Sequence, residues 1–195
     1  MGKGGTTMTK ICIISGLSGA GKDTVITELK KQYPLSWVIT TTTRPMRPGE
    51  SEGNPYHFVS VAEFERMIMN DELIEHAKVY DYYYGPQKKD VAAALAADAP
   101  AVIMKVDYQG AESIKALYPE AIVIFIVPPS MEILKQRLIT RGQDSSEVIE
   151  RRLAEADTEM ARVKTWSHAH HVVNEQDQLD KTVEEVYQLI QQEAR

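Results

Sequence analysis

Between two apolar segments, the sequence reads Gly16-Leu17-Ser18-Gly19-Ala20-Gly21-Lys22-Asp23-Thr24. This run fits the phosphate-loop pattern G-x-x-x-x-G-K. The β-branched stretch 10–15 before it predicts a buried strand, and helical spacing of apolar residues follows it as far as Pro34. Glycines allow backbone amides to converge on an anion, and the helix N-terminus adds its dipole. The alternative, a chance glycine-rich turn, does not account for this strand–loop–helix order.

The loop therefore predicts an ATP site, with Lys22 reaching the β- and γ-phosphates. Where the pattern has Ser or Thr after the lysine, this chain has Asp23, and Thr24 follows. Because Mg²⁺ prefers oxygen ligands, Asp23 and Thr24 are candidate ligands for a magnesium ion bound with ATP. Alternatively, Asp23 only favours the positive end of the helix.

Further apolar patterns alternate along the chain and predict an α/β fold with a parallel sheet covered by helices on both faces. The expected strands are 10–15, 37–42, 58–59, 101–106, 122–127 and 172–173, with an extended stretch at 72–77 and an aromatic turn at 82–86. The expected helices are the one after the loop, then 61–70, 88–97, 110–117, 130–141, a helix ending near 164, and a C-terminal amphipathic helix. Ser130 is the expected N-cap and Gly142 the expected C-terminal glycine of one helix, and Asp144 with Glu147 resembles a capping box for the next.

The composition is that of a globular domain, with 195 residues, 43% hydrophobic and 26% charged. A net charge of −6 argues against a nucleic-acid partner. Since no apolar stretch approaches the ~18 residues of a membrane span, no membrane partner is expected. The single cysteine, Cys12, is expected to be a small buried hydrophobe, which suits a reducing compartment such as the cytoplasm.

A loop with positive charges follows the second predicted strand. Arg44 and Arg47 lie three residues apart on a segment stiffened by prolines, and Tyr56 follows shortly after. Two arginines in fixed geometry can grip a phosphate dianion, and a tyrosine hydroxyl can complete the grip. The alternative is a solvated surface loop. This pattern predicts a second phosphate site, for an acceptor.

With these motifs, the sequence resembles the guanylate kinase family from Ile11 to the C-terminal helix. That family shows T-T-R-x-x-R-x-G-E, Y-x-F, F-I-E, Y-Y-G and D-x-Q-G in this order. Here they stand as Thr42-Thr43-Arg44 with Arg47 and Gly49-Glu50, Tyr56-His57-Phe58, Leu73-Ile74-Glu75, Tyr83-Tyr84-Gly85 and Asp107-Tyr108-Gln109-Gly110.

The resemblance implies a P-loop kinase fold with an inserted GMP-binding lobe and a helical lid. The implied organisation is a flexible leader at 1–9 and one domain at 10–195. Within that domain the core is formed by 10–40, 98–129 and 165–195, the GMP-binding lobe by 41–97 and the lid by 130–164.

The resemblance also implies how GMP is bound. Its phosphate would be held by Arg44, Arg47, Tyr56 and Tyr84. Glu75 and Asp107 would accept from guanine N1–H and the 2-amino group, which adenine lacks. Thr40, where the family usually has Ser, would donate to guanine O6. The alternative for Glu75 is a charge at a strand edge.

For the lid, the resemblance implies three arginines that close over the phosphates, Arg137, Arg141 and Arg152. With Lys22 and Arg44 they form the expected catalytic set, although any of the three could instead lie on a helix surface. Asn174 matches a family position near the adenine of ATP.

Two further residues depart from the family pattern. Lys105 stands where an acid usually lies near the metal, and Pro86 where the family has Ser or Thr after Tyr-Tyr-Gly. Residues 105 and 107 share a strand face, so we expect Lys105 to point into the site. Lys105 and Asp23 would then represent an exchange of charges, in which the acid has moved to the loop and the base to the strand. The alternative is a lysine whose charge reaches the surface.

The expected function is phosphoryl transfer from ATP to GMP, giving ADP and GDP. Two alternatives remain at this point. One is a guanylate-kinase-like binding module without activity, which Asp23 and Lys105 keep open although Gly16, Gly21 and Lys22 are present. The other, motivated by Pro86, is a kinase for a different small phosphorylated acceptor.

Overall fold

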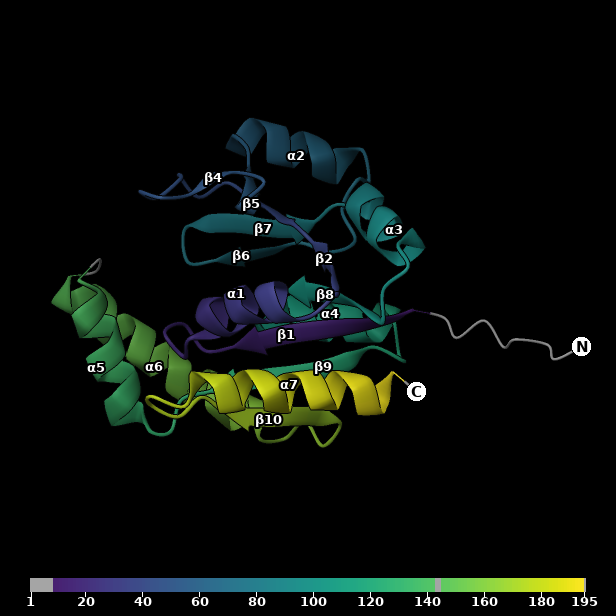
Figure 1. Ribbon diagram of the computed structural model, residues 1–195. Coiled ribbons are helices and arrows are strands. Elements are labelled where there is room, and N and C mark those ends of the chain that lie inside the picture. The colour runs from purple at the N-terminus through teal and green to yellow at the C-terminus, as the bar shows by residue number, and fades with distance from the viewer. Residues whose placement is uncertain (1–8, 143–144, 195) are drawn as a thin grey trace, which may run out of the picture.

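The computed structural model describes residues 9–142 and 145–194. Within these ranges the chain forms two five-stranded sheets that lie one above the other, with helices between and around them (Figure 1). Residues 1–8 of the expected leader, and Asp144 of the expected capping box, lie outside the described residues.

The central sheet is parallel throughout, as the sequence predicted. Its order is β10-β9-β1-β8-β2, with bounds Ala169–Val173, Ile122–Val127, Lys10–Gly16, Ala101–Lys105 and Ser36–Val38. Alternate residues of β1 face two separate apolar layers. Cys12 and Ile14 pack with residues of α1 and α7, whereas Ile13 packs with residues of α4 on the other face (Figure 1). The parallel arrangement brings the ends of β1, β8 and β9 to one edge of the sheet.

The second sheet is mixed and contains the residues of the acceptor motifs. Its order is β4-β5-β3-β7-β6, with bounds Ser51–Glu52, Pro55–Phe58, Thr40–Thr42, Tyr82–Pro86 and Ala77–Val79. The prediction of one strand over 37–42 was wrong, because the chain leaves the central sheet at Ile39 and enters the second sheet at Thr40. Buried β-branched residues continue across this break, so the pattern alone could not show it.

The structure differs from two other expectations at the hairpin formed by β6 and β7. The extended stretch expected at 72–77 becomes a strand only from Ala77, and the aromatic turn expected at 82–86 is itself strand β7. The tyrosines are strand residues because their rings pack within this layer. Tyr83 stacks on Phe64 with ring centroids 5.5 Å apart, and Tyr84 meets Tyr56 edge-on at 5.8 Å.

The described helices follow the sequence expectations closely. They are α1 Lys22–Gln32, α2 Val61–Met69, α3 Lys88–Ala96, α4 Tyr108–Leu117, α5 Met131–Arg141, α6 Ser146–Val163 and α7 Leu179–Glu193. Ser130 caps α5 by accepting from the amide of Ile133, and Gly142 ends it with φ 64, as predicted. No helix in the described ranges is both long enough and apolar enough to cross a membrane.

Two helix starts differ from the prediction. α4 begins at Tyr108 rather than Gly110, because the carboxylate of Asp107 caps it by accepting from the Gly110 amide. The N-cap of α6 is Ser145, which accepts from the Val148 amide, and not the predicted Asp144. Serine and aspartate are equally good caps, so adjacent candidates could not be separated by sequence.

Cys12 is fully buried in β1, as expected for a small hydrophobe. Burial raises the pKa of its thiol well above the usual range, because the thiolate would lose its hydration. The thiol therefore stays protonated and unreactive in the folded chain.

Phe125 offers a test of the central sheet. Its side chain is 1% exposed and packs against Tyr108 and Trp166. We expect Phe125→Ala to lower the free energy of unfolding by about 3–5 kcal/mol, measured by urea denaturation, because it leaves a cavity in a close-packed core. Leu117→Ala, at a residue 58% exposed, is the matched control and should cost less than about 1 kcal/mol. Equal losses in the two variants would contradict this packing.

Candidate active site

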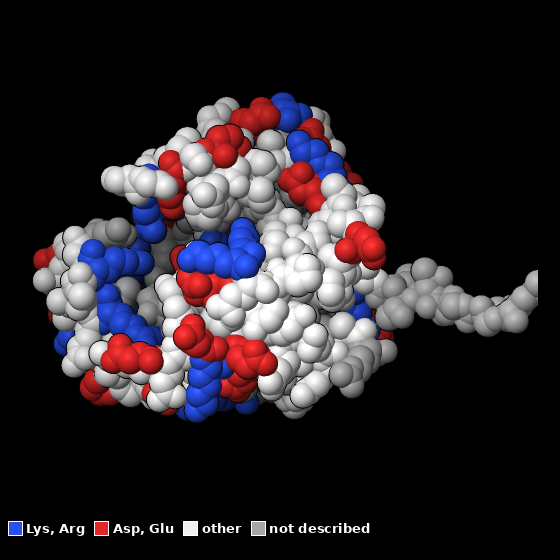
Figure 2. Space-filling model, in the orientation of Figure 1, with Lys and Arg blue, Asp and Glu red and all other residues white. Residues whose placement is uncertain are grey.

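A cleft of about 790 Å³ lies between the edge of the central sheet, the second sheet and helices α5 and α6. This volume is in the range of small-molecule sites. Lys and Arg side chains gather around the hollow (Figure 2). The predicted site residues that line it are Gly16, Leu17, Ser18, Gly19, Gly21, Lys22, Asp23, Thr24, Thr40, Arg44, Arg47, Tyr56, Glu75, Tyr84, Asp107, Arg137, Arg141 and Arg152. Ala20 and Asn174 are the predicted site residues outside this lining.

The phosphate loop joins β1 to α1 at the floor of the cleft. Gly21, with φ 90, precedes the helix, so the first amides of α1 open toward the loop. The Lys22 ammonium donates to the carbonyl of Gly16 at 2.8 Å and so folds back over the loop. Burial lowers the pKa of Lys22, although nearby Asp23 opposes this. The loop thus holds a lysine charge beside converging backbone donors, which is an anion site.

Behind the loop, two side chains hold its backbone in place. Asn174 donates from its amide to the carbonyl of Ala20 at 2.8 Å and is only 7% exposed. Arg137 donates to the same carbonyl at 3.2 Å and to the Asn174 carbonyl at 2.9 Å. Asn174 therefore contacts the loop itself in this structure, where the sequence suggested the neighbourhood of adenine.

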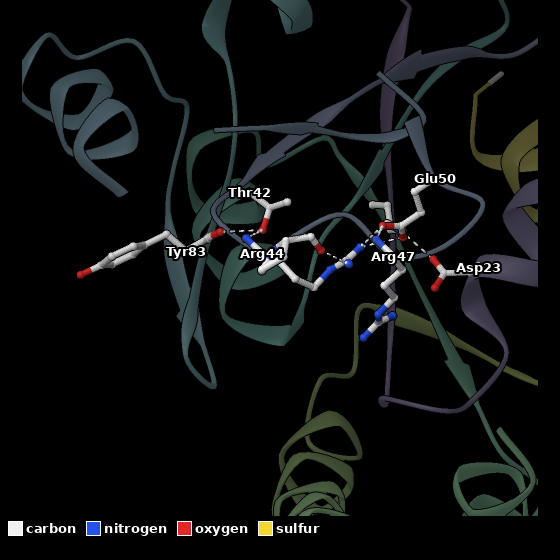
Figure 3. A network of polar contacts seen from close by, with 8 residues as sticks. Asp23, Thr42, Arg44, Arg47, Glu50 and Tyr83 are labelled. Atoms are coloured by element: carbon white, nitrogen blue, oxygen red, sulfur yellow. Dashed lines mark hydrogen bonds and ion pairs between the residues drawn. The ribbon is translucent and has the colours of Figure 1, made fainter. Parts of the chain in front are cut away.

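Arg44 is held by an acid that the sequence analysis gave no role. One of its guanidinium nitrogens donates to both carboxylate oxygens of Glu50, at 2.7 and 2.9 Å, and another donates to the carbonyl of Pro45 at 2.7 Å (Figure 3). Glu50 also accepts from the Arg47 amide at 2.8 Å, while the Arg47 side chain points away from it (Figure 3). Despite burial, the hydrogen bond and charge of Glu50 raise the pKa of Arg44. The Glu50 carboxylate thus holds both arginines: it binds the side chain of Arg44 and the backbone amide of Arg47.

Tyr56 and Tyr84 lie beside these arginines on β5 and β7. The Arg44 guanidinium lies 5.4 Å from the centroid of the Tyr56 ring. Burial raises the pKa of Tyr56, so its hydroxyl keeps its proton at neutral pH and remains a donor. Arginine and tyrosine donors are therefore concentrated on one wall of the cleft.

Where the second sheet meets the end of β8, two carboxyl groups approach each other, those of Glu75 and Asp107. One oxygen of Glu75 is buried and has no hydrogen-bond partner among the described residues. Burial, together with the charge of Asp107, raises the pKa of Glu75 to about 7. One Asp107 oxygen accepts from Gly110, where a side chain would clash, since a Cβ would lie 2.8 Å from a Glu75 oxygen. A ligand that offers N–H donors here would relieve an unfavourable buried charge.

Lys105 points into the cleft, as predicted, and does not reach the surface as the alternative proposed. Its side chain is 12% exposed, and its ammonium is 2.8 Å from an oxygen of Asp23. It also lies 4.1 Å from the Tyr56 ring centroid, while Thr40 donates to the Lys105 carbonyl at 3.0 Å. Although desolvation opposes it, the charges of Lys105 and Lys22 lower the pKa of Asp23 to about 2. This ion pair joins the phosphate loop to the wall that carries Tyr56.

Helix α6 contributes residues that the sequence analysis only partly found. Arg152 donates to the hydroxyl of Ser18 at 3.0 Å, which places it over the phosphate loop. Glu159 lies two turns further along the same helical face, lines the cleft and has its pKa raised by burial. Glu159 follows Arg152 by seven residues, a spacing that puts both on one face of a helix, and this spacing could have identified it from the sequence. Tyr80, at the turn of β6–β7, also lines the cleft and was missed.

The raised pKa of Glu75 gives a prediction about stability and pH. A carboxyl whose pKa is higher in the folded than in the unfolded chain stabilises the fold below its unfolded pKa, and this stability is lost as pH rises through about 7. Glu75→Gln removes this titration. We therefore expect the variant to gain stability relative to the unsubstituted chain between pH 4.5 and pH 8, in urea unfolding.

The exposed Glu65→Gln is the matched control, and its difference from the unsubstituted chain should stay constant over that pH range. A parallel pH dependence of the unsubstituted chain and Glu75→Gln would contradict the assigned burial and repulsion at Glu75.

Comparisons with known proteins agree with this geometry. The family model described as guanylate kinase matches residues 8–193. A guanylate kinase of Gloeobacter violaceus is 43% identical over 190 residues, covering 97% of this chain and 90% of that protein. One of Dechloromonas aromatica is 44% identical over 165 residues, covering 84% and 80%. The crystal structure of guanylate kinase from Anaplasma phagocytophilum superposes with a TM-score of 0.78 at 27% identity, covering 97% of this chain and 88% of that one. With a phosphate loop, a two-walled cleft and these relatives, the chain belongs to the guanylate kinase family.

Proposed function

We propose that the chain transfers the terminal phosphoryl group of ATP to GMP, giving ADP and GDP. The observation that carries this proposal is a buried oxygen of Glu75 that has no hydrogen-bond partner among the described residues; it lies beside Asp107, in the same cleft as the phosphate loop. Two acceptors at neighbouring positions match guanine N1–H and the 2-amino group. Adenine offers neither donor there and would leave the buried oxygen of Glu75 unpaired.

On the donor side, the proposal assigns ATP to the phosphate loop. Backbone amides of residues 16–24 would surround the β- and γ-phosphates, and Lys22 would exchange its bond with the Gly16 carbonyl for phosphate oxygens. Arg152 and Arg141 would neutralise charge on the transferring group. Arg137 already anchors the loop through the Ala20 carbonyl, so it both holds the loop and brings a cation to it.

On the acceptor side, the phosphate of GMP would lie against Arg44, Arg47, Tyr56 and Tyr84. Glu50 keeps the Arg44 guanidinium oriented before the nucleotide arrives, which lowers the entropic cost of binding. Thr40 lines the same cleft as the two carboxyl groups, and its hydroxyl would turn from the Lys105 carbonyl toward guanine O6.

Magnesium is the cofactor that fits the donor side, bound together with ATP. Asp23 uses one oxygen on Lys105 and keeps a side chain that is 78% exposed, and the neighbouring Thr24 hydroxyl is exposed in the cleft. Two oxygen ligands suit Mg²⁺, which usually takes few protein ligands and completes its shell with phosphates and water. When bound, the ion would supply positive charge to the phosphate oxygens. Among the described residues no cluster of three or more His, Cys, Asp or Glu forms a protein-only metal site.

The proposal includes ATP and GMP as the partners and the cytoplasm as the compartment, and it includes no nucleic acid or membrane. The buried, protonated Cys12 needs no oxidising environment. The negative net charge of −6 remains unsuited to a polyanion outside the cleft.

A panel of acceptors tests the function. GMP, dGMP, AMP, UMP and ribose 5-phosphate are each mixed with ATP and Mg²⁺, and ADP release is measured. We expect turnover with GMP and far less with AMP and UMP, and we expect Glu75→Gln to lower kcat/KM for GMP about 10–100-fold, because a charged hydrogen-bond acceptor is lost. Binding of GMP without turnover would indicate the non-catalytic module, and preference for another phosphate would indicate a different acceptor.

A second test concerns the proposed charge exchange between Asp23 and Lys105. Their contact at 2.8 Å predicts coupling, so kcat of Asp23→Ser, Lys105→Asp and the double variant should deviate from additivity by about 0.5–3 kcal/mol. The double variant restores the acid on the strand and a hydroxyl on the loop, and should be more active than Lys105→Asp alone. Additive effects, together with improved turnover of Lys105→Asp alone, would refute the exchange. Lys78→Asp, on the exposed face of β6, is the control.

A further inference from the structure

Tyr80 occupies a backbone conformation that its side chain disfavours. It lies at the turn between β6 and β7 with φ 54, in the left-handed region. The other non-glycine residues described with positive φ are Asp71 and Asp177, and aspartate tolerates this region well. A bulky tyrosine remains there only when its surroundings favour it. The contacts of the Tyr80 side chain provide such surroundings.

Those contacts cross the cleft. The Tyr80 ring lies 5.1 Å from the guanidinium of Arg152 and 5.3 Å from that of Arg151, both on α6. Its hydroxyl interacts with Glu155, one turn further along the helix. The turn of β6–β7 lies on the side of the molecule where α5 and α6 are found (Figure 1). The Tyr80 side chain, at the turn of β6–β7, thus contacts the α6 helix.

Arg152 continues this connection to the phosphate loop, through its bond to the Ser18 hydroxyl at 3.0 Å. A series of contacts therefore runs from the β6–β7 hairpin through the Tyr80 ring and Arg152 to the phosphate loop. Burial and the nearby Glu155 raise the pKa of Tyr80 to about 12, so the phenol stays neutral at physiological pH. A neutral ring keeps its face available to the guanidinium groups, and its hydroxyl keeps its proton.

We propose that Tyr80 is a positioning residue that holds Arg152 over the phosphate loop and thereby couples the acceptor wall of the cleft to the donor site. This inference rests on the proposed function, because Arg152 would there neutralise the transferring phosphoryl group. In this role Tyr80 acts through Arg152 and not directly on the nucleotides. Its ring restricts the directions in which a long, flexible arginine can point, so the effect falls on the reaction step rather than on GMP affinity.

Three substitutions separate this role from a purely structural one. Tyr80→Phe keeps the ring and loses the hydroxyl, Tyr80→Leu loses the ring, and Tyr80→Asn loses the ring while suiting positive φ. We expect kcat to fall about tenfold in the Leu and Asn variants, with KM for GMP changed less than about twofold, and to stay within about threefold in Phe. Tyr80→Asn should unfold at an equal or higher temperature than the unsubstituted chain. A residue needed only for stability would give the reverse, with lower melting temperature and unchanged kcat.

Dependence on Arg152 is tested in the Arg152→Ala background. If Tyr80 acts through Arg152, Tyr80→Leu should lower kcat there by less than about twofold. Tyr33→Leu is the matched control: the Tyr33 ring packs against a side chain, that of Tyr187, and its hydroxyl bonds the Glu184 carboxylate, but Tyr33 lies outside the lining of the cleft. It should lower stability and leave kcat unchanged. An equal loss from Tyr80→Leu with and without Arg152 would overturn the inference.

One measurement does not depend on turnover. Amide hydrogen exchange in α6 should become faster in Tyr80→Leu than in the unsubstituted chain, because the helix loses its contact with the hairpin. Unchanged exchange would overturn the inference even if GMP were not the acceptor. An inactive but exchange-sensitive protein would instead refute the proposed reaction and leave the contact between Tyr80 and α6 supported.

Discussion

The turn that leaves β1 depends on a position where no side chain fits. At Gly16, with φ 147, a Cβ atom would lie 2.2 Å from the carbonyl oxygen of Ile126 on the neighbouring strand. Only glycine can occupy position 16 in this backbone conformation. Because it bends there, the loop passes the edge of the sheet, α1 begins at Lys22, and the Ala20 carbonyl comes within reach of Asn174 and Arg137. The position of the donor side of the cleft therefore depends on the close approach between Gly16 and Ile126.

Charge in the cleft is arranged in two different ways. Glu50 and Asp23 are paired with Arg44 and Lys105, so these acids orient cations and add little negative charge of their own. Glu75, beside Asp107, carries no such partner among the described residues and keeps a raised pKa. The first arrangement suits phosphate binding and the second suits a base with N–H donors. A chain with net charge −6 can therefore still bind two anionic nucleotides.

Local patterns predicted most of this. Apolar periodicity found the strands of the central sheet and the helices, since burial dictates those residues directly. It failed at Ile39, where the chain changes sheets without a change in pattern, and at Tyr82–Pro86, where tyrosines serve as strand residues. The resemblance of motifs located the cleft residues. It could not reveal that Asn174 bonds the loop, that Glu50 fixes Arg44, or that Tyr80 reaches α6, because such contacts depend on three-dimensional placement.

The single cysteine has a practical consequence. Cys12 is fully buried and its thiol remains protonated, so alkylating reagents have no access to it in the folded chain. A cysteine introduced on an exposed position of the second sheet or of α6 would be the one accessible thiol. Paired labels at two such positions would report the separation of the cleft walls in solution, without first removing a native residue. The burial of Cys12 thus makes any change in this separation on nucleotide binding directly observable by spectroscopy.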